Sequence, residues 1–154
     1  IEELLALPAE SFGHQFASHL HRNGLKPDFY DAIQITGVGD YLIMRVRQTH
    51  DIWHVVLGYD TSVAGELAVQ GAYLSQLGDG FAGLLLAAGI LHTLKKDPLG
   101  YIETMDQIFD AYHRCKQAAP FITVKWEEKW HVPMADLRRE LRIPSPRRQK
   151  IGAL

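Results

Sequence analysis

The apolar residues of this chain recur mostly at intervals of three and four, which is the spacing of one face of a helix. Phe12, Phe16 and Leu20 lie four apart, and Gly24 after them is a typical left-handed helix end. Runs in which apolar and polar residues alternate, as in a half-buried strand, are nearly absent. The pattern therefore predicts an all-α fold.

Glycine, proline and capping residues divide the chain into further helices. Gly58 and Gly78 are expected to end two of them, Asp40 and either Thr61 or Ser62 to cap their starts, and Asp97-Pro98 to open another. The predicted segments are 28–34, 41–57, 62–77, 80–96, 99–117 and 134–142. Because no internal repeat divides the chain, residues 1–154 are predicted to form a single domain. It is a bundle of roughly seven or eight helices with a loose basic tail at about 143–154.

The segment 80–96 changes this picture because it is apolar on all sides. Such a helix is either buried or in contact with lipid, and a central core helix is the preferred interpretation. In the alternative, its small residues leave room for a lipid chain. The segment is too short to cross a bilayer, which needs about 20 apolar residues. Core and lipid groove therefore both stay open.

Composition and charge exclude several classes of protein. Hydrophobic residues make up 47% and charged residues 22%, as in an ordinary soluble domain. A net charge of −2 argues against a nucleic-acid binder, and a single cysteine, Cys115, excludes an intrachain disulfide. The acidic start "IEELLALPAE" does not resemble a signal or transit peptide.

Charge is unevenly distributed along the chain. Residues 136–150 carry six basic side chains against Asp136 and Glu140, a net charge of +4, which leaves −6 elsewhere given the total of −2. The six are Arg138, Arg139, Arg142, Arg147, Arg148 and Lys150. This segment is expected to contact an anionic membrane surface. The alternative is a solvated terminus.

The stretch "THDIWHVVLGYDTSVAGE" gathers candidate metal ligands. His50, Asp51 and His54 lie three or four apart on one face of the predicted helix 41–57. Glu66 lies twelve residues past His54, about 18 Å away along one continuous helix, but a helix end at Gly58 would turn the chain back. Two imidazoles with carboxylates suit Zn²⁺, Fe²⁺, Mn²⁺ or Co²⁺. An exposed polar helix face is the alternative.

Two arginines precede these residues. Arg47 shares their face and is a candidate for binding a substrate carboxylate or phosphate, unless it simply pairs with Asp51. Arg45 is predicted to be a surface charge, and Trp53 and Tyr59 to be packing residues. Three histidines of the first predicted helix are expected on the surface: His14, His19 and His21.

Several stretches resemble one known family, named for the fourth Coq protein of ubiquinone (coenzyme Q) biosynthesis. Its signature is His-Asp-x-x-His followed by Glu after eleven residues, which is matched by His50, Asp51, His54 and Glu66. "LLALPAESFGHQFASHL", "RVRQTHDIWHVVLGY" and "VKWEEKWHVPMADLRRELRI" resemble other parts of the family in the same order. The resemblance covers nearly the whole chain.

The resemblance implies an all-helical protein with one divalent metal ion (Zn, Fe, Mn, Co or Mg) on those four residues. They would be both ligands and catalytic residues. The implied substrate is a polyprenylated aromatic precursor, whose C1 carboxylate is replaced by hydroxyl in an oxidative decarboxylation. The alternative is a non-catalytic isoprenoid-lipid carrier or a scaffold for other quinone-biosynthesis enzymes.

The same resemblance sets the expected partners and location. The partners are a polyprenyl lipid, other quinone-biosynthesis proteins, a membrane surface and a second copy in a homodimer, with no nucleic acid. Without an organellar targeting segment, a bacterial member is expected, cytoplasmic and peripherally bound to the inner face of a membrane.

Overall fold

The computed structural model describes residues 1–26 and 34–145. Within these ranges the regular structure is helical, apart from one isolated bridge between Ser11 and Pro133. The helices are α1 (Glu2–Leu5), α2 (Phe12–Asn23), α3 (Val38–Leu57), α4 (Val63–Leu77), α5 (Gly80–Lys96), α6 (Gly100–Gln117), η1 (Phe121–Thr123), η2 (Trp126–Glu128) and α7 (Met134–Glu140). The prediction of a single all-α domain with roughly seven or eight helices is confirmed.

Most helix ends follow the predicted punctuation. Gly58 and Gly78 end α3 and α4 in the left-handed conformation, and the Ser62 hydroxyl caps α4 by accepting from the Gly65 N–H. The prediction for Asp40 is wrong: α3 begins at Val38, and the Asp40 carboxylate in its first turn accepts from the N–H and hydroxyl of Thr36. The predicted helix 28–34 lies outside the described residues except for its last position.

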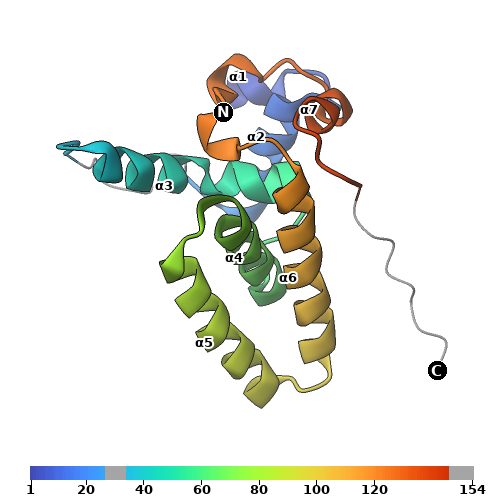
Figure 1. The fold of residues 1–154 in the computed structure, drawn as a ribbon. Coiled ribbons are helices and arrows are strands. Elements are labelled where there is room, and N and C mark those ends of the chain that lie inside the picture. The colour runs from blue at the N-terminus through green and yellow to red at the C-terminus, as the bar shows by residue number, and fades with distance from the viewer. Residues whose placement is uncertain (27–33, 146–154) are drawn as a thin grey trace.

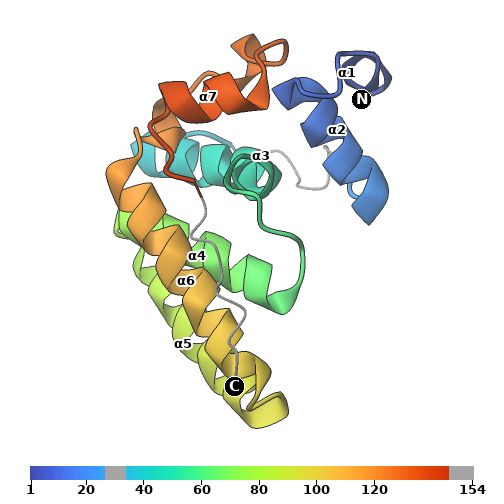
Figure 2. The same cartoon turned by 90° about the vertical axis from the view of Figure 1, so that its right-hand side faces the viewer.

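Helix α3 separates two groups of elements (Figures 1 and 2). On one side lie α1, α2 and α7. On the other, α4 packs along α6 and also against α5, and α5 and α6 meet in a turn at the far end of the molecule (Figure 1). The helix with the candidate ligands therefore lies between both groups.

An aromatic core joins α3 to its neighbours. Trp53 is fully buried, with its ring centroid 4.9 Å from that of Phe121, and Phe12 stacks on Trp130 at the same distance. Fully burying a large side chain contributes about 1.5–3 kcal/mol, and more for an indole. Trp53 is thus a packing residue, as predicted.

The prediction that segment 80–96 forms a central core helix is wrong. Only Ala82, Leu86 and Thr93 of α5 are buried. Its exposed apolar residues are Phe81, Leu84, Leu85, Leu91 and Leu94. Gly89 lies so close to Leu67 of α4 that a Cβ would overlap the leucine side chain, so this small residue serves helix packing. No helix of the described ranges is long and apolar enough to cross a bilayer.

Two arginines hold the carboxyl end of α3. Arg138 donates from Nε to the Val56 carbonyl at 2.8 Å and from Nη2 to the Val55 carbonyl at 3.1 Å. Arg114 is buried and donates from Nη1 to the Leu57 carbonyl at 3.1 Å. Helix ends leave such carbonyls without intrahelical partners. Arg138 is therefore a structural residue, which corrects its expected place among the membrane-facing basic side chains.

Two further expectations need correction. Arg45 is not a surface charge, because its side chain is only 15% exposed and donates to the Val124 carbonyl at 2.6 Å. The predicted loose tail does not begin at 143, since Ile143 is buried and the Pro144 carbonyl accepts from Arg114. The chain is packed up to this point, and residues 146–154 lie outside the described ranges.

Candidate metal centre

His50, His54 and Glu66 come together at the turn between α3 and α4. The two histidines lie one helical turn apart on α3, and Glu66 lies in the first turn of α4. Gly58, with a φ of 82°, ends α3, and Ser62 caps α4, so the chain reverses between them. The sequence prediction that this break brings Glu66 to the histidine pair is confirmed.

Two imidazole nitrogens and the two carboxylate oxygens of Glu66 lie close together. His50 Nε2 lies 3.3 Å from His54 Nε2 and 3.3 Å from Glu66 Oε2, and His54 Nε2 lies 3.4 Å from Glu66 Oε1. Metal bonds of about 2.0–2.1 Å in a tetrahedral arrangement place neighbouring donors about 3.3–3.4 Å apart. Each of these pairs therefore has the spacing of two ligands of one small divalent ion, with one Glu66 oxygen next to each histidine.

The hydrogen bonds behind the imidazoles suit this role. His54 Nδ1 lies 3.3 Å from the Tyr59 carbonyl, which only accepts, so Nδ1 carries the proton of neutral His54. Nε2 then presents its lone pair to the cluster. His50 Nδ1 lies 2.9 Å from the Tyr73 hydroxyl, which orients that ring. Such outer partners are typical of metal-binding histidines.

Glu66 is charged and accessible. Without a bound ion, hydrogen bonds donated by protonated His50 and His54 hold the pKa of the Glu66 carboxyl well below its usual range. The side chain of Glu66 is 42% exposed and that of His50 22%, whereas His54 is fully buried. The cluster is thus anchored on the His54 side and open to a ligand on the Glu66 side.

The other two predicted site residues lie apart from this cluster. Asp51 is half-buried and is not among the donor groups gathered within 4.8 Å in the described part of the chain. Its negative charge nevertheless acts on His19 of α2. Arg47 is exposed and lies one helical turn before His50, on the face predicted for it.

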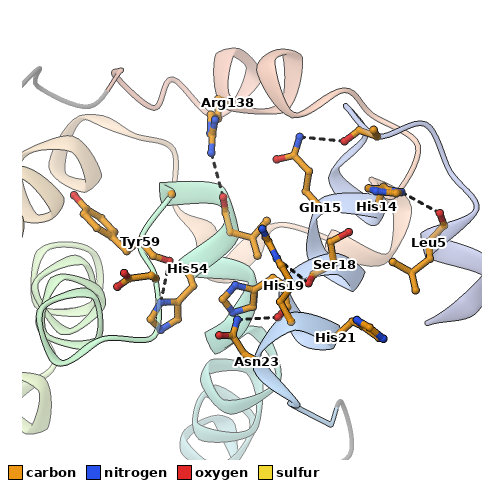
Figure 3. A pocket seen from close by; sticks show the side chains of 15 residues that line it. Leu5, His14, Gln15, Ser18, His19, His21, Asn23, His54, Tyr59 and Arg138 are labelled. Carbon is orange, nitrogen blue, oxygen red and sulfur yellow. Dashed lines mark hydrogen bonds between the residues drawn. The ribbon is translucent and has the colours of Figure 1, made fainter.

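His19 is a site residue that the sequence prediction missed. It is buried, not on the surface, and its ring stacks on that of His54 with centroids 5.9 Å apart (Figure 3). Its Nε2 is buried without a hydrogen-bond partner among the described residues, and this burial lowers the pKa of His19. The signal was the helical period, since His19 falls on the same face as Phe12 and Phe16.

A cleft of about 850 Å³ lies on the other side of His54, between α2, the end of α3 and α7 (Figure 3). Its polar lining includes the arginines Arg22 and Arg138, the histidines His14, His19 and His21, and Asp60 as the acidic member. Tyr59 and Val55 contribute apolar surface. A cleft of this size accommodates a substituted aromatic ring, and it is not the groove along segment 80–96 that the sequence suggested.

Comparison with known proteins adds a consistent result. A family model described as "Coenzyme Q (ubiquinone) biosynthesis protein Coq4" matches residues 1–147. A Drosophila ananassae protein named ubiquinone biosynthesis protein COQ4 homolog, mitochondrial, is 32% identical, covering 91% of this chain and 53% of the relative. A Culex quinquefasciatus homologue is 30% identical, covering 91% of this chain and 50% of its own length. The chain spans about half the length of these curated relatives.

A solved structure is also similar. A crystal structure of a Nostoc punctiforme protein, assigned provisionally to ubiquinone biosynthesis, superposes with a TM-score of 0.84 at 30% identity. The match covers 94% of this chain and 68% of that one. The bacterial neighbour is consistent with the expected bacterial member. Together with the sequence signature and the helical fold, these matches show that the chain belongs to the Coq4 family of coenzyme Q (ubiquinone) biosynthesis proteins.

Proposed function

We propose that this protein holds one divalent metal ion on His50, His54 and Glu66 and acts on a polyprenylated aromatic precursor of ubiquinone. The reaction is the oxidative decarboxylation at C1: the ring carboxylate leaves as CO₂, a hydroxyl whose oxygen comes from water takes its place, and the two electrons released pass to dioxygen, which becomes hydrogen peroxide. The observation that carries the proposal is the donor spacing of 3.3–3.4 Å. Two imidazoles favour Zn, Fe, Mn or Co over Mg.

Each residue around the metal centre has its own proposed role. A bound ion supplies Lewis-acid stabilisation of negative charge on substrate oxygens. His54 donates from Nδ1 to the Tyr59 carbonyl, which fixes the orientation of its buried ring. Tyr73 fixes the orientation of His50. Arg47 is proposed to bind the substrate carboxylate in bidentate fashion.

Asp51 is the fourth residue of the family signature, and two roles are proposed for it. It acts on the site through its charge, or it becomes a ligand after rotation of its side chain. Asp51→Asn distinguishes them. A charge role lowers metal affinity by about 10–100-fold, the usual loss for an outer partner, whereas a ligand role loses nearly all of the bound metal.

The second candidate function is a carrier or scaffold that binds isoprenoid lipids and other quinone-biosynthesis enzymes at a membrane surface, on its own or as a homodimer. The specific observation in its favour is the exposed apolar face of α5. Such patches mark interaction sites. Both functions place the protein peripherally at the inner face of a membrane.

Turnover separates the two candidates. Purified protein loaded with each metal in turn is given a prenylated hydroxybenzoate labelled at the carboxyl carbon, with air as oxidant, and released CO₂ is counted. We expect release by the wild type and its loss in Glu66→Gln and His54→Ala. The matched controls are Glu103→Gln and His113→Ala, which change exposed residues of α6. No release with any metal, together with lipid binding unaffected by Glu66→Gln, favours the carrier.

A further inference from the structure

The turn between α5 and α6 carries apolar side chains where a globular protein usually places polar ones. We define the hairpin tip as Leu91, Leu94, Lys95, Lys96, Leu99 and Ile102. Leu99 is 91% exposed, Leu91 68% and Ile102 67%. Figures 1 and 2 both place this turn at the end of the molecule farthest from α1, α2 and α7. Such a concentration of exposed apolar residues marks an interaction surface.

The charged side chains of α5 near the hairpin tip are basic. Between its capping residue Asp79 and Asp97, α5 has no acidic side chain, and it ends in Lys95 and Lys96. Both lysines are exposed and take no part in the ion pairs found within the described ranges. Asp97 is turned back to accept from the Gly100 N–H. Apolar side chains beside free lysines are typical of segments that lie in the head-group region of an anionic membrane.

We propose that the hairpin tip is the membrane-docking element of this protein, and that its partner is a single leaflet containing anionic lipids. The apolar side chains reach the boundary of the acyl chains, while Lys95 and Lys96 contact the head groups. Docking is shallow, because Glu103 of α6 is exposed next to Ile102. The inference deepens the proposed function, in which the substrate has a membrane-soluble tail.

Shape favours a membrane over a second copy of the chain. The tip is the convex end of two helices that diverge from a common turn (Figure 1). A stable dimer buries about 800 Å² on each partner and needs a complementary surface, whereas a leaflet adapts to a protruding tip. Of the basic segment 136–150, Arg138 is bound to carbonyls of α3 and Arg139 pairs with Asp136. Among the described residues the tip is therefore the stronger candidate for docking, and residues 146–150 of this segment lie outside them.

Co-sedimentation with vesicles tests the proposal. The full chain is mixed with vesicles of phosphatidylcholine alone or of phosphatidylcholine with phosphatidylglycerol. The tip variant combines Leu91→Ser, Leu99→Ser and Ile102→Ser. The matched control combines three substitutions of exposed apolar residues in the first turns of α3, Val38→Ser, Tyr41→Ser and Ile43→Ser.

The tip variant is expected to lose roughly tenfold in partition for each side chain that leaves the lipid. The control is expected to partition like the wild type. Lys95→Gln and Lys96→Gln are each expected to lose about fivefold on anionic vesicles and nothing on phosphatidylcholine. Unchanged binding of the tip variant, or an equal loss in the control, overturns the proposal.

Sedimentation velocity and metal analysis of the same samples complete the test. A wild-type dimer that the tip variant converts to a monomer, with vesicle binding unchanged, shows that the tip joins two copies and overturns the proposal. Full metal content in the tip variant shows that the loss is independent of the metal centre. Conversely, His54→Ala is expected to lose metal and still bind vesicles, so the proposed function can fail while this inference stands.

Discussion

The metal cluster and the hairpin tip differ in which side chains are buried and which are exposed. Near the cluster, polar side chains are buried: His54 has no exposed surface, and His19 and Arg114 are almost as buried. At the tip, apolar groups are outside, with Leu99 91% exposed. Ordinary packing explains neither, because buried polar groups and exposed apolar patches are the two informative departures from it. Both therefore indicate function.

The buried polar groups of the first region are stabilised by specific partners. Arg114 Nη1 donates to the Leu57 carbonyl, the Tyr59 hydroxyl and the Asp110 carboxylate. Tyr59 in turn donates to Asp110 at 2.9 Å. This network links α6 to the end of α3 next to His54. The tip has no comparable network in the part of the chain described, and its side chains are available to an outside partner.

Substitution of a core aromatic residue is expected to give the largest effect. Trp53→Ala should lower the free energy of unfolding by about 3–5 kcal/mol, because it leaves a large cavity beside Phe121 and Tyr73. Leu99→Ala should change it by less than about 0.5 kcal/mol. Urea unfolding followed by circular dichroism measures both. Equal losses would mean that the tip is packed in solution and would remove the contrast between the two regions.

Removing the guanidinium from the network ranks next. Arg114→Leu is expected to cost about 3 kcal/mol, since it leaves Asp110 without its buried cation and the Leu57 carbonyl without its donor. Arg139→Leu, on the exposed face of α7, is the matched control. Arg114→Leu combined with Asp110→Leu should recover part of the loss. A double variant less stable than the single one would contradict a paired network.

Filling the contact between α4 and α5 should give a smaller loss. Gly89→Ala is expected to cost about 1–3 kcal/mol, because the new methyl group overlaps Leu67. Leu67→Ala is costly by itself because Leu67 is buried, but Gly89→Ala should cost less in the Leu67→Ala background than in the wild type. Thermal unfolding reports the order of the three variants. If Gly89→Ala is as stable as the wild type, α5 is free to move away from α4.

The effect that is smallest at neutral pH concerns the ionisation of Cys115. Burial raises the pKa of the Cys115 thiol from 9.0 to about 12. The folded state thus keeps a proton that the unfolded state releases, so stability is complete below pH 9.0 and falls as the pH rises toward 12. The slope is at most about 1.4 kcal/mol per pH unit. Cys115→Ala should flatten it, and alkylation of the native thiol at neutral pH should be negligible. Rapid alkylation would show that α6 opens.

The features that could be predicted from the sequence are those set by local signals, such as helix caps. The ends of α3 and α4 follow from Gly58, Ser62 and Gly78, because their effect is confined to one turn of backbone. The meeting of His50, His54 and Glu66 follows from the same punctuation. The position of α5 does not, because an apolar helix suits a core and an exposed docking face equally well. Tertiary neighbours decide between them.

The same limit applies to charged and polar residues. Arg138 reads as one of six basic side chains near the end of the chain, and only the fold brings it to the carbonyls of Val55 and Val56. Arg45 likewise reaches Val124 across 79 residues of sequence. His19 was within reach of prediction, since the helical period already placed it with Phe12 and Phe16. Contacts of a side chain with residues distant in the sequence could not be predicted.

Metal stoichiometry tests the central claim most directly. Wild-type protein, His54→Ala, Glu66→Gln and the control His113→Ala are purified in parallel and their metal is counted by plasma mass spectrometry. The account predicts about one divalent ion per chain in the wild type and control, almost none in His54→Ala, and weakened binding in Glu66→Gln with its helical signal intact. Equal metal content in all four proteins, or metal absent from all of them after loading, would contradict it.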